Sequence, residues 1–197
     1  RADVAERPVV LLYGDEDGNE PDSAWVTEGA IRWLVSDDPR AIALRKQVTF
    51  LCIPLFDPDG MDQGQYATLT YGFRLRQLDD PVFPEVLAYT RFITEWMLRG
   101  RRLDVACAFH NVQCTETPNV MCPVIDMRRP VETEGINAFI LERLPGVRTS
   151  AGSWMTGLLD DRFNGWCNRH WGTVIIDYEI NSRYPAKRLE LPELLTL

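Results

Sequence analysis

Four short apolar segments constrain the fold of this chain more strongly than any other feature of its sequence. They are expected to be buried strands and span residues 8–13, 48–56, 103–109 and 173–178. Helix-forming segments lie between several of them. Strands that alternate with helices pair in parallel. We therefore expect an α/β fold, with a mostly parallel twisted sheet covered by helices on both faces.

Two helices are predicted between the first two strands. Apolar residues recur at helical spacing over residues 25–34, and Asp22 or Ser23 is the expected N-cap of that helix. A second helix is expected to begin at Pro39, because proline favours the first helical position and Asp38 before it is a good cap.

The segments after the second strand carry weaker signals. The Asp-Pro-Asp-Gly run at 57–60 is typical of a turn, and Pro84 opens a strongly amphipathic helix. We expect a long loop over residues 110–133 and a short helix over 136–144. Residues 151–170 contain several aromatic residues and glycines, and their pattern favours neither a helix nor a strand.

Composition limits the classes of function. The 197 residues are 45% hydrophobic, so we expect a single domain over residues 1–197; because the first residue is Arg1, a fragment of a longer chain is left open. A net charge of -8 repels phosphate backbones, so no nucleic-acid partner is expected. No apolar run reaches the roughly 20 residues that span a bilayer. We expect a soluble protein and favour the cytoplasm, while the compartment and the oligomeric state stay open.

The five cysteines do not indicate a metal or redox motif, since none are spaced as C-x-x-C. Cys52 and Cys107 lie in apolar runs and are expected to be buried thiols. A disulfide between Cys114 and Cys122 is left open.

Polar side chains follow each predicted strand. After the four strands come, in order, Asp15-Glu16-Asp17 with Glu20, then Asp57 with Asp59, then His110-Asn111, and finally Glu179. In open parallel sheets the functional crevice lies beyond the carboxyl ends of the strands. We therefore expect these side chains to gather at one edge of the sheet.

A cation site is the chemistry that this group favours. Asp17 and Glu20 are three residues apart on a loop and can bind one ion together, while His110 would add a nitrogen ligand. Three protein ligands and a water molecule make up a catalytic zinc site. Glu179 would be the nearby carboxylate that takes a proton from that water.

The same residues carry a resemblance to a known family. The run Asp17-Gly18-Asn19-Glu20, followed by Ser23-Ala24-Trp25-Val26 and by Pro54-Leu55-Phe56-Asp57-Pro58-Asp59-Gly60, resembles the zinc metallocarboxypeptidases, and most of all their cytosolic branch. The similarity is dense over residues 9–72. It implies the zinc-carboxypeptidase fold, a bound zinc ion and a peptide or acyl-amino-acid substrate.

The resemblance also implies a role for each matching residue. Glu20 and His110 match the glutamate and the second histidine that bind zinc, and Glu179 matches the general base. Asp17 stands where the first histidine ligand belongs. An extra oxygen ligand makes the site harder, so divalent ions other than zinc come into consideration.

Several departures concern the substrate. Asp57 replaces an asparagine, and Ala67 stands at the place of the arginine that polarises the scissile carbonyl. The stretch that should hold the terminal carboxylate contains Arg74 and Arg76, our candidates for substrate binding. Ala108 stands where an aspartate would orient the histidine.

Two hypotheses follow, and they differ in class. The first is a metal-dependent hydrolase of peptide or amide bonds, and the second is an inactive carboxypeptidase-like module that binds a partner in its cleft. The related acyl-amino-acid amidohydrolases share an H-G-N-E motif that residues 17–20 partly match. Simpler readings make Asp17 a loop residue of a degraded site, pair Glu179 with Arg183 or another basic residue, and make His170 a structural or surface residue.

Overall fold

The computed structural model describes residues 7–64, 84–111, 120–123, 135, 138–139, 142–143, 148–149 and 163–180. Its strands form one six-stranded sheet in the order β2-β1-β3-β6-β4-β5. They are β1 (Val9–Gly14), β2 (Thr49–Ile53), β3 (Val105–Asn111), β4 (Val120–Pro123), β5 (Arg148–Thr149) and β6 (Val174–Ile180). The strands β2, β1, β3 and β6 are parallel, and β4 is antiparallel to β6. The mostly parallel sheet is confirmed.

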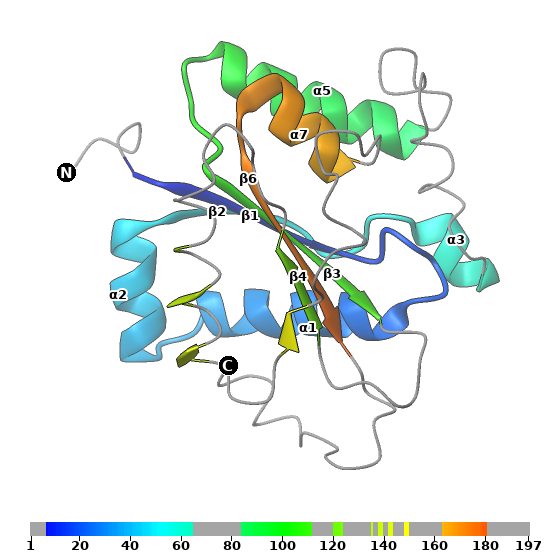
Figure 1. Cartoon of the computed structure of the whole chain (residues 1–197), viewed down its shortest axis with the longest axis horizontal. Helices are drawn as coiled ribbons and strands as arrows, with labels where there is room; N and C mark the ends of the chain where they lie inside the picture. The colour runs from blue at the N-terminus through cyan, green and yellow to red at the C-terminus, as the bar shows by residue number, and fades with distance from the viewer. Residues whose placement is uncertain are drawn as a thin grey trace.

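Helices cover both faces of this sheet, as predicted (Figure 1). They are α1 (Pro21–Leu34), α2 (Pro39–Gln47), α3 (Pro58–Gln63), α5 (Pro84–Leu98) and α7 (Phe163–Trp171). The helices α1 and α2 lie on one face, and α5 and α7 lie on the other. No helix of the described residues is both long enough and apolar enough to cross a bilayer.

An aromatic cluster forms the core between the sheet and the α5–α7 layer. The rings of Tyr13, Phe56 and Phe163 are fully buried. The Phe56 ring centroid lies 5.3 Å from that of Tyr13, 5.2 Å from that of Phe163 and 4.4 Å from that of Tyr89. Because Phe56 directly follows the Pro54-Leu55 pair after β2, this packing also fixes where the chain goes beyond that strand.

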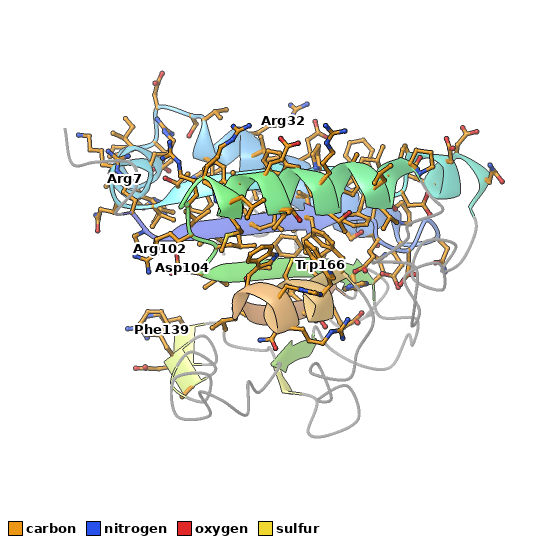
Figure 2. The ribbon with its side chains drawn as sticks, turned by 90° about the horizontal axis from the view of Figure 1, so that it is seen from above. Arg7, Arg32, Arg102, Asp104, Phe139 and Trp166 are labelled. Atoms are coloured by element: carbon orange, nitrogen blue, oxygen red, sulfur yellow. The ribbon has the colours of Figure 1, made fainter. Side chains whose placement is uncertain are left out.

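A side-chain contact aligns β1 with β3 at their amino-terminal ends. The Val9 N–H donates to Asp104 Oδ2 over 2.8 Å, and the Arg102 Nε–H donates to Asp104 Oδ1 over 2.9 Å. Figure 2 shows Arg102 and Asp104 together at this end of the molecule, away from the carboxyl ends of the strands.

The helix starts were predicted with mixed success. Asp38 caps α2, because its carboxylate accepts from the Arg40 N–H, as expected. The expected cap at Asp22 or Ser23 is wrong, since α1 begins at Pro21 and its N-cap Glu20 makes no capping side-chain bond.

The Asp-Pro-Asp-Gly run starts a helix rather than a plain turn. Asp57 is the N-cap of α3, and its Oδ1 accepts from the Gly60 N–H over 2.8 Å. Proline after a capping aspartate is a signal that turns and helix starts share.

The strands run further than predicted at the functional edge. His110 and Glu179 lie within β3 and β6 rather than beyond them. The predicted loop over residues 110–133 is wrong at 120–123, which form β4. Residues 138–139 and 142–143 are helical, as predicted. In the segment 151–170, whose pattern favoured neither a helix nor a strand, the residues from Phe163 onward belong to the helix α7.

The thiols fit the prediction in part. Cys52 and Cys107 are free but only half-buried, while Cys167 is free and fully buried. The side chains of Cys114 and Cys122 lie outside the described residues.

Replacing Phe56 with alanine should lower the free energy of unfolding by about 3–5 kcal/mol, because the cavity would lie among three aromatic rings. Urea unfolding followed by circular dichroism measures the change. Phe92→Ala is the control, since its ring on α5 is 47% exposed. Equal losses in the two variants would contradict the proposed core.

Candidate metal centre

The loop between β1 and α1 is held tightly at the carboxyl ends of the strands. A Cβ atom at Gly14 would lie 2.4 Å from the Ser23 carbonyl oxygen, so only glycine fits there. The next residue, Asp15, has a φ of 61°, which turns the chain away from the strand. Its N–H donates to Ser23 Oγ over 2.8 Å, and its carbonyl accepts from the Asp57 N–H over 2.9 Å.

Gly18 is a second close approach in this loop. A Cβ atom there would lie 2.2 Å from the carbonyl carbon of Gly60, inside the backbone of α3. The glycine of the Asp-Gly-Asn-Glu run thus lets the loop pack on α3, which sets the direction of Asp17 and Glu20 on either side of it.

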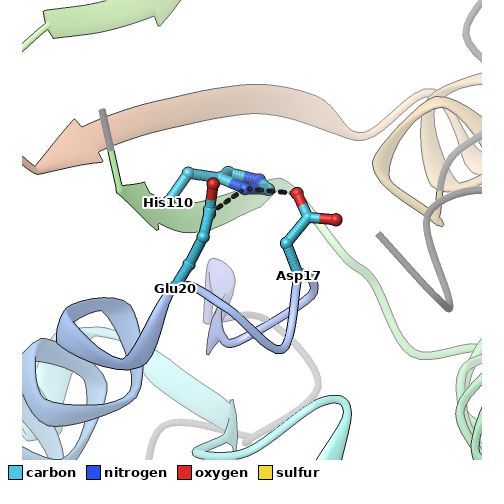
Figure 3. A group of neighbouring side chains, drawn as sticks. All are labelled: Asp17, Glu20 and His110. Atoms are coloured by element: carbon cyan, nitrogen blue, oxygen red, sulfur yellow. Dashed lines mark hydrogen bonds and ion pairs between the residues drawn. The ribbon is translucent and has the colours of Figure 1, made fainter. Parts of the chain in front are cut away.

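Asp17, Glu20 and His110 meet at one point, which Figure 3 shows. Glu20 Oε2 lies 3.0 Å and Asp17 Oδ2 lies 3.7 Å from His110 Nδ1. One donor atom from each residue lies within 4.8 Å of the other two, and all three residues are buried. The sequence therefore predicted a real cluster, with the two carboxylates facing the same edge of the imidazole ring.

Asn111 holds the glutamate in place, and sequence reasoning did not give it this role. Its backbone N–H donates to Glu20 Oε2 over 3.0 Å. Its side chain bonds the first turn of α1, accepting from the Ser23 N–H and donating to Asp22 Oδ2. The only signal in the sequence was its place directly after His110.

Glu179 lies beside His110 across the sheet. The two are register partners in the parallel pair β3–β6, so their side chains lie on the same face. That face also carries Ala106 and Ala108 of β3, which pack in the α5–α7 core. Glu179 is half-buried, so this edge of the site meets solvent more than the three buried residues do.

The centre concentrates negative charge in the interior. Five of its carboxylates are buried, namely those of Asp15, Glu16, Asp17, Glu20 and Asp57. Among the described residues that are buried, His110 is the only basic one. Buried charges are costly unless they are paired or bind a cation, so one imidazole leaves this cluster short of positive charge.

This imbalance shifts the protonation of the neighbouring groups. Burial, together with the charges of Asp57, Glu20 and Asp17, raises the pKa of Asp15 to about 7. Burial alone would lower the pKa of His110, but the carboxylates of Asp17, Glu20 and Glu179 outweigh it and hold that pKa well above the ordinary value. An ion at this point would stabilise the charged carboxylates that the fold otherwise penalises.

The chain is similar in sequence and in fold to several known proteins. No profile of a known protein family matches the chain. Cytosolic carboxypeptidase 2 of Danio rerio is 34% identical over 110 residues, which cover 54% of this chain and 15% of that protein. A solved metallo-carboxypeptidase from Burkholderia cenocepacia is 21% identical and superposes with a TM-score of 0.76, over 99% of this chain and 55% of that one.

A second solved structure gives the same fold. It is a metallo-carboxypeptidase from Pseudomonas aeruginosa in complex with (2-guanidinoethylmercapto)succinic acid, 16% identical, with a TM-score of 0.71 over 99% of this chain and 56% of that one. The chain has a zinc-carboxypeptidase-like fold. It spans about half the length of these two bacterial proteins and a much smaller part of the curated relative.

The remaining predicted residues of this carboxypeptidase-like chain have separate outcomes. The candidates for substrate binding, Arg74 and Arg76, lie outside the described residues, as does Ala67. His170 is exposed on α7, with its ring centroid 5.3 Å from that of Trp166, so the surface reading is confirmed. Asp57 caps α3, which gives it a structural role whatever else it does.

In the metal-free protein, the titration of Asp15 should make the free energy of unfolding depend on pH. The unfolded chain releases this proton near pH 4, whereas the folded chain keeps it until about pH 7, so stability falls between these values. The free energy of unfolding of the wild type should therefore fall by up to about 4 kcal/mol relative to Asp15→Asn over that range.

Urea unfolding at several pH values, in the presence of a chelator, measures this difference. Asp62→Asn, at an exposed position, is the control and should follow the wild type. A constant difference between Asp15→Asn and the wild type from pH 4 to pH 7 would contradict the assignment.

Proposed function

We propose that this chain is a metal-dependent hydrolase of peptide or amide bonds. Asp17, Glu20 and His110 would hold one divalent ion, and Glu179 would act as the general base. One observation carries the proposal: three buried carboxylates, those of Glu16, Asp17 and Glu20, lie 3.0–3.7 Å from the single buried imidazole of His110, and two of them form with it a group that could hold a metal ion.

The donor set fits a divalent ion. One oxygen of Asp17, one oxygen of Glu20 and one ring nitrogen of His110 lie within 4.8 Å of one another. Asp15, in the same loop as Asp17, has two buried oxygens that find no hydrogen-bond partner among the described residues. Nitrogen and oxygen ligands suit zinc, while two carboxylates also suit harder ions such as manganese. When bound, the ion supplies the charge that acidifies water and polarises a carbonyl group.

The residues of the chain would divide the remaining work. Glu179 would take a proton from the attacking water and deliver it to the leaving amine, as a general base and then a general acid. Asn111 would keep Glu20 oriented through its backbone N–H. The burial of Asp17, Glu20 and His110 would exclude bulk water from one side of the reacting group.

The proposed substrate is a peptide or an acyl-amino acid. Its support is the likeness to proteins named carboxypeptidases, one of which is in complex with a guanidino-substituted succinic acid. Arg74 and Arg76 remain the proposed partners of the substrate's terminal carboxylate. The substrate is a proposal, because the chain spans only part of each of these proteins.

An inactive binding module is the second candidate function. The observation that favours it is Asp17, which stands where the family resemblance places a histidine ligand. A site that lacks this histidine would bind its ion less selectively and give it less power to acidify water.

The wild type should bind one zinc ion, and His110→Ala should weaken this binding by more than about 100-fold. Removing a residue that supports a metal ligand typically lowers metal affinity about 10- to 100-fold, and removing the ligand itself should lower it more. Titration calorimetry of protein freed of metal, repeated with manganese, makes the measurement. His170→Ala is the matched control, since the chain has only two histidines. No binding to the wild type at micromolar metal would contradict the proposed site.

Glu179→Gln should greatly slow hydrolysis while it leaves zinc affinity nearly unchanged. Loss of a general base typically lowers the rate by about 100- to 10,000-fold. The assay uses N-blocked dipeptides with acidic, basic or apolar carboxy-terminal residues, together with N-acyl amino acids. Glu142→Gln is the control, because that side chain is 75% exposed. If the zinc-loaded wild type cleaves none of these, the binding-module function replaces the hydrolase.

A further inference from the structure

The two nitrogens of His110 face different partners. Nδ1 faces the carboxylates of Glu20 and Asp17 at 3.0 and 3.7 Å. Nε2, on the opposite edge of the ring, lies 3.6 Å from Glu16 Oε2 and has no hydrogen-bond partner among the described residues. The imidazole is thus enclosed by carboxylates on both edges, and only one of these edges belongs to the proposed ion site.

Glu16 is placed for this contact by the backbone of the β1–α1 loop. Gly14 pairs in register with Phe109, so the loop leaves β1 level with the residue before His110. The backbone of Asp15 is bonded on both sides, to Ser23 and to Asp57. The Glu16 side chain itself is fully buried, so a carboxylate is held next to the ring inside the protein.

A histidine that binds an ion through Nδ1 must carry its proton on Nε2. A carboxylate that faces Nε2 stabilises this tautomer and fixes the plane of the ring. At 3.6 Å the contact is an ion-pair distance rather than a hydrogen bond. Asp17 and Glu20 both face the other ring nitrogen, Nδ1.

We propose that Glu16 is a positioning residue: it orients His110 and fixes the Nε2–H tautomer, so that Nδ1 is available to the ion. Sequence resemblance places such an aspartate at position 108, where this chain has a buried alanine. The role has moved from β3 to the β1–α1 loop. This inference rests on the proposed metal-dependent function, but its test includes a measurement without metal.

Glu16→Gln keeps the shape of the side chain and removes its charge. It should weaken zinc binding by about 10- to 100-fold, the usual effect of losing a ligand's supporting partner. Asp15→Asn is the matched control when zinc binding is compared well above pH 7, where the Asp15 carboxylate is ionised, because it then removes a buried charge one residue away that is not in contact with Nε2. Equal losses of affinity in the two variants would mean a general charge effect and would overturn the proposal.

Long-range ¹H–¹⁵N spectra report which nitrogen of each imidazole carries the proton. If Glu16 only supported the fold, its replacement would leave this protonation unchanged. In metal-free protein, Glu16→Gln should shift the His110 Nε2 resonance more than Asp15→Asn does, with His170 as an internal reference. In zinc-loaded wild type, which needs no variant, His110 should carry its proton on Nε2, and a proton on Nδ1 would overturn the proposal. If the wild type fails to bind zinc, the proposed function is contradicted. If the wild type binds zinc, and Glu16→Gln has the same zinc affinity and the same spectra, only this inference is contradicted.

Discussion

One carboxylate oxygen, Glu20 Oε2, joins the two parts of the chain on which the site depends. It lies 3.0 Å from His110 Nδ1 and accepts from the Asn111 N–H at the same distance. These contacts connect residues 90 and 91 positions apart in the sequence, at the start of α1 and the end of β3. The parallel pairing of β1 with β3 brings the loop and the strand end to the same edge of the sheet.

Packing elsewhere in the fold offsets the cost in stability of burying the charges of the site. Burying the carboxylates of Asp15 and Glu16 costs stability, whereas the aromatic cluster around Phe56 contributes stability. The two regions are connected directly, since the Phe56 N–H donates to the Gly14 carbonyl and the Asp57 N–H to the Asp15 carbonyl. A rigid core beside the loop can therefore hold carboxylates together that would otherwise repel one another.

The sequence contains enough to predict the central sheet and the three-residue cluster. Buried strands have a strong apolar signal, and the Asp-Gly-Asn-Glu spacing limits how Asp17 and Glu20 can face. The strands β4 and β5 were missed because they have four and two residues, too few for a recognisable period. The role proposed for Glu16 depends on the edge of the His110 ring that it faces, and the role of Asn111 depends on its hydrogen bonds to Glu20 and to the first turn of α1. Spacing along the chain encodes neither.

The central claim is that one divalent ion lies among Asp17, Glu20 and His110. Anomalous diffraction at the zinc absorption edge, from crystals grown with zinc, tests it most directly. The account predicts a strong anomalous peak within bonding distance of His110 Nδ1 and of both carboxylates. A structure with zinc present in the crystal but no peak there, or with a peak only at the exposed His170, would contradict it.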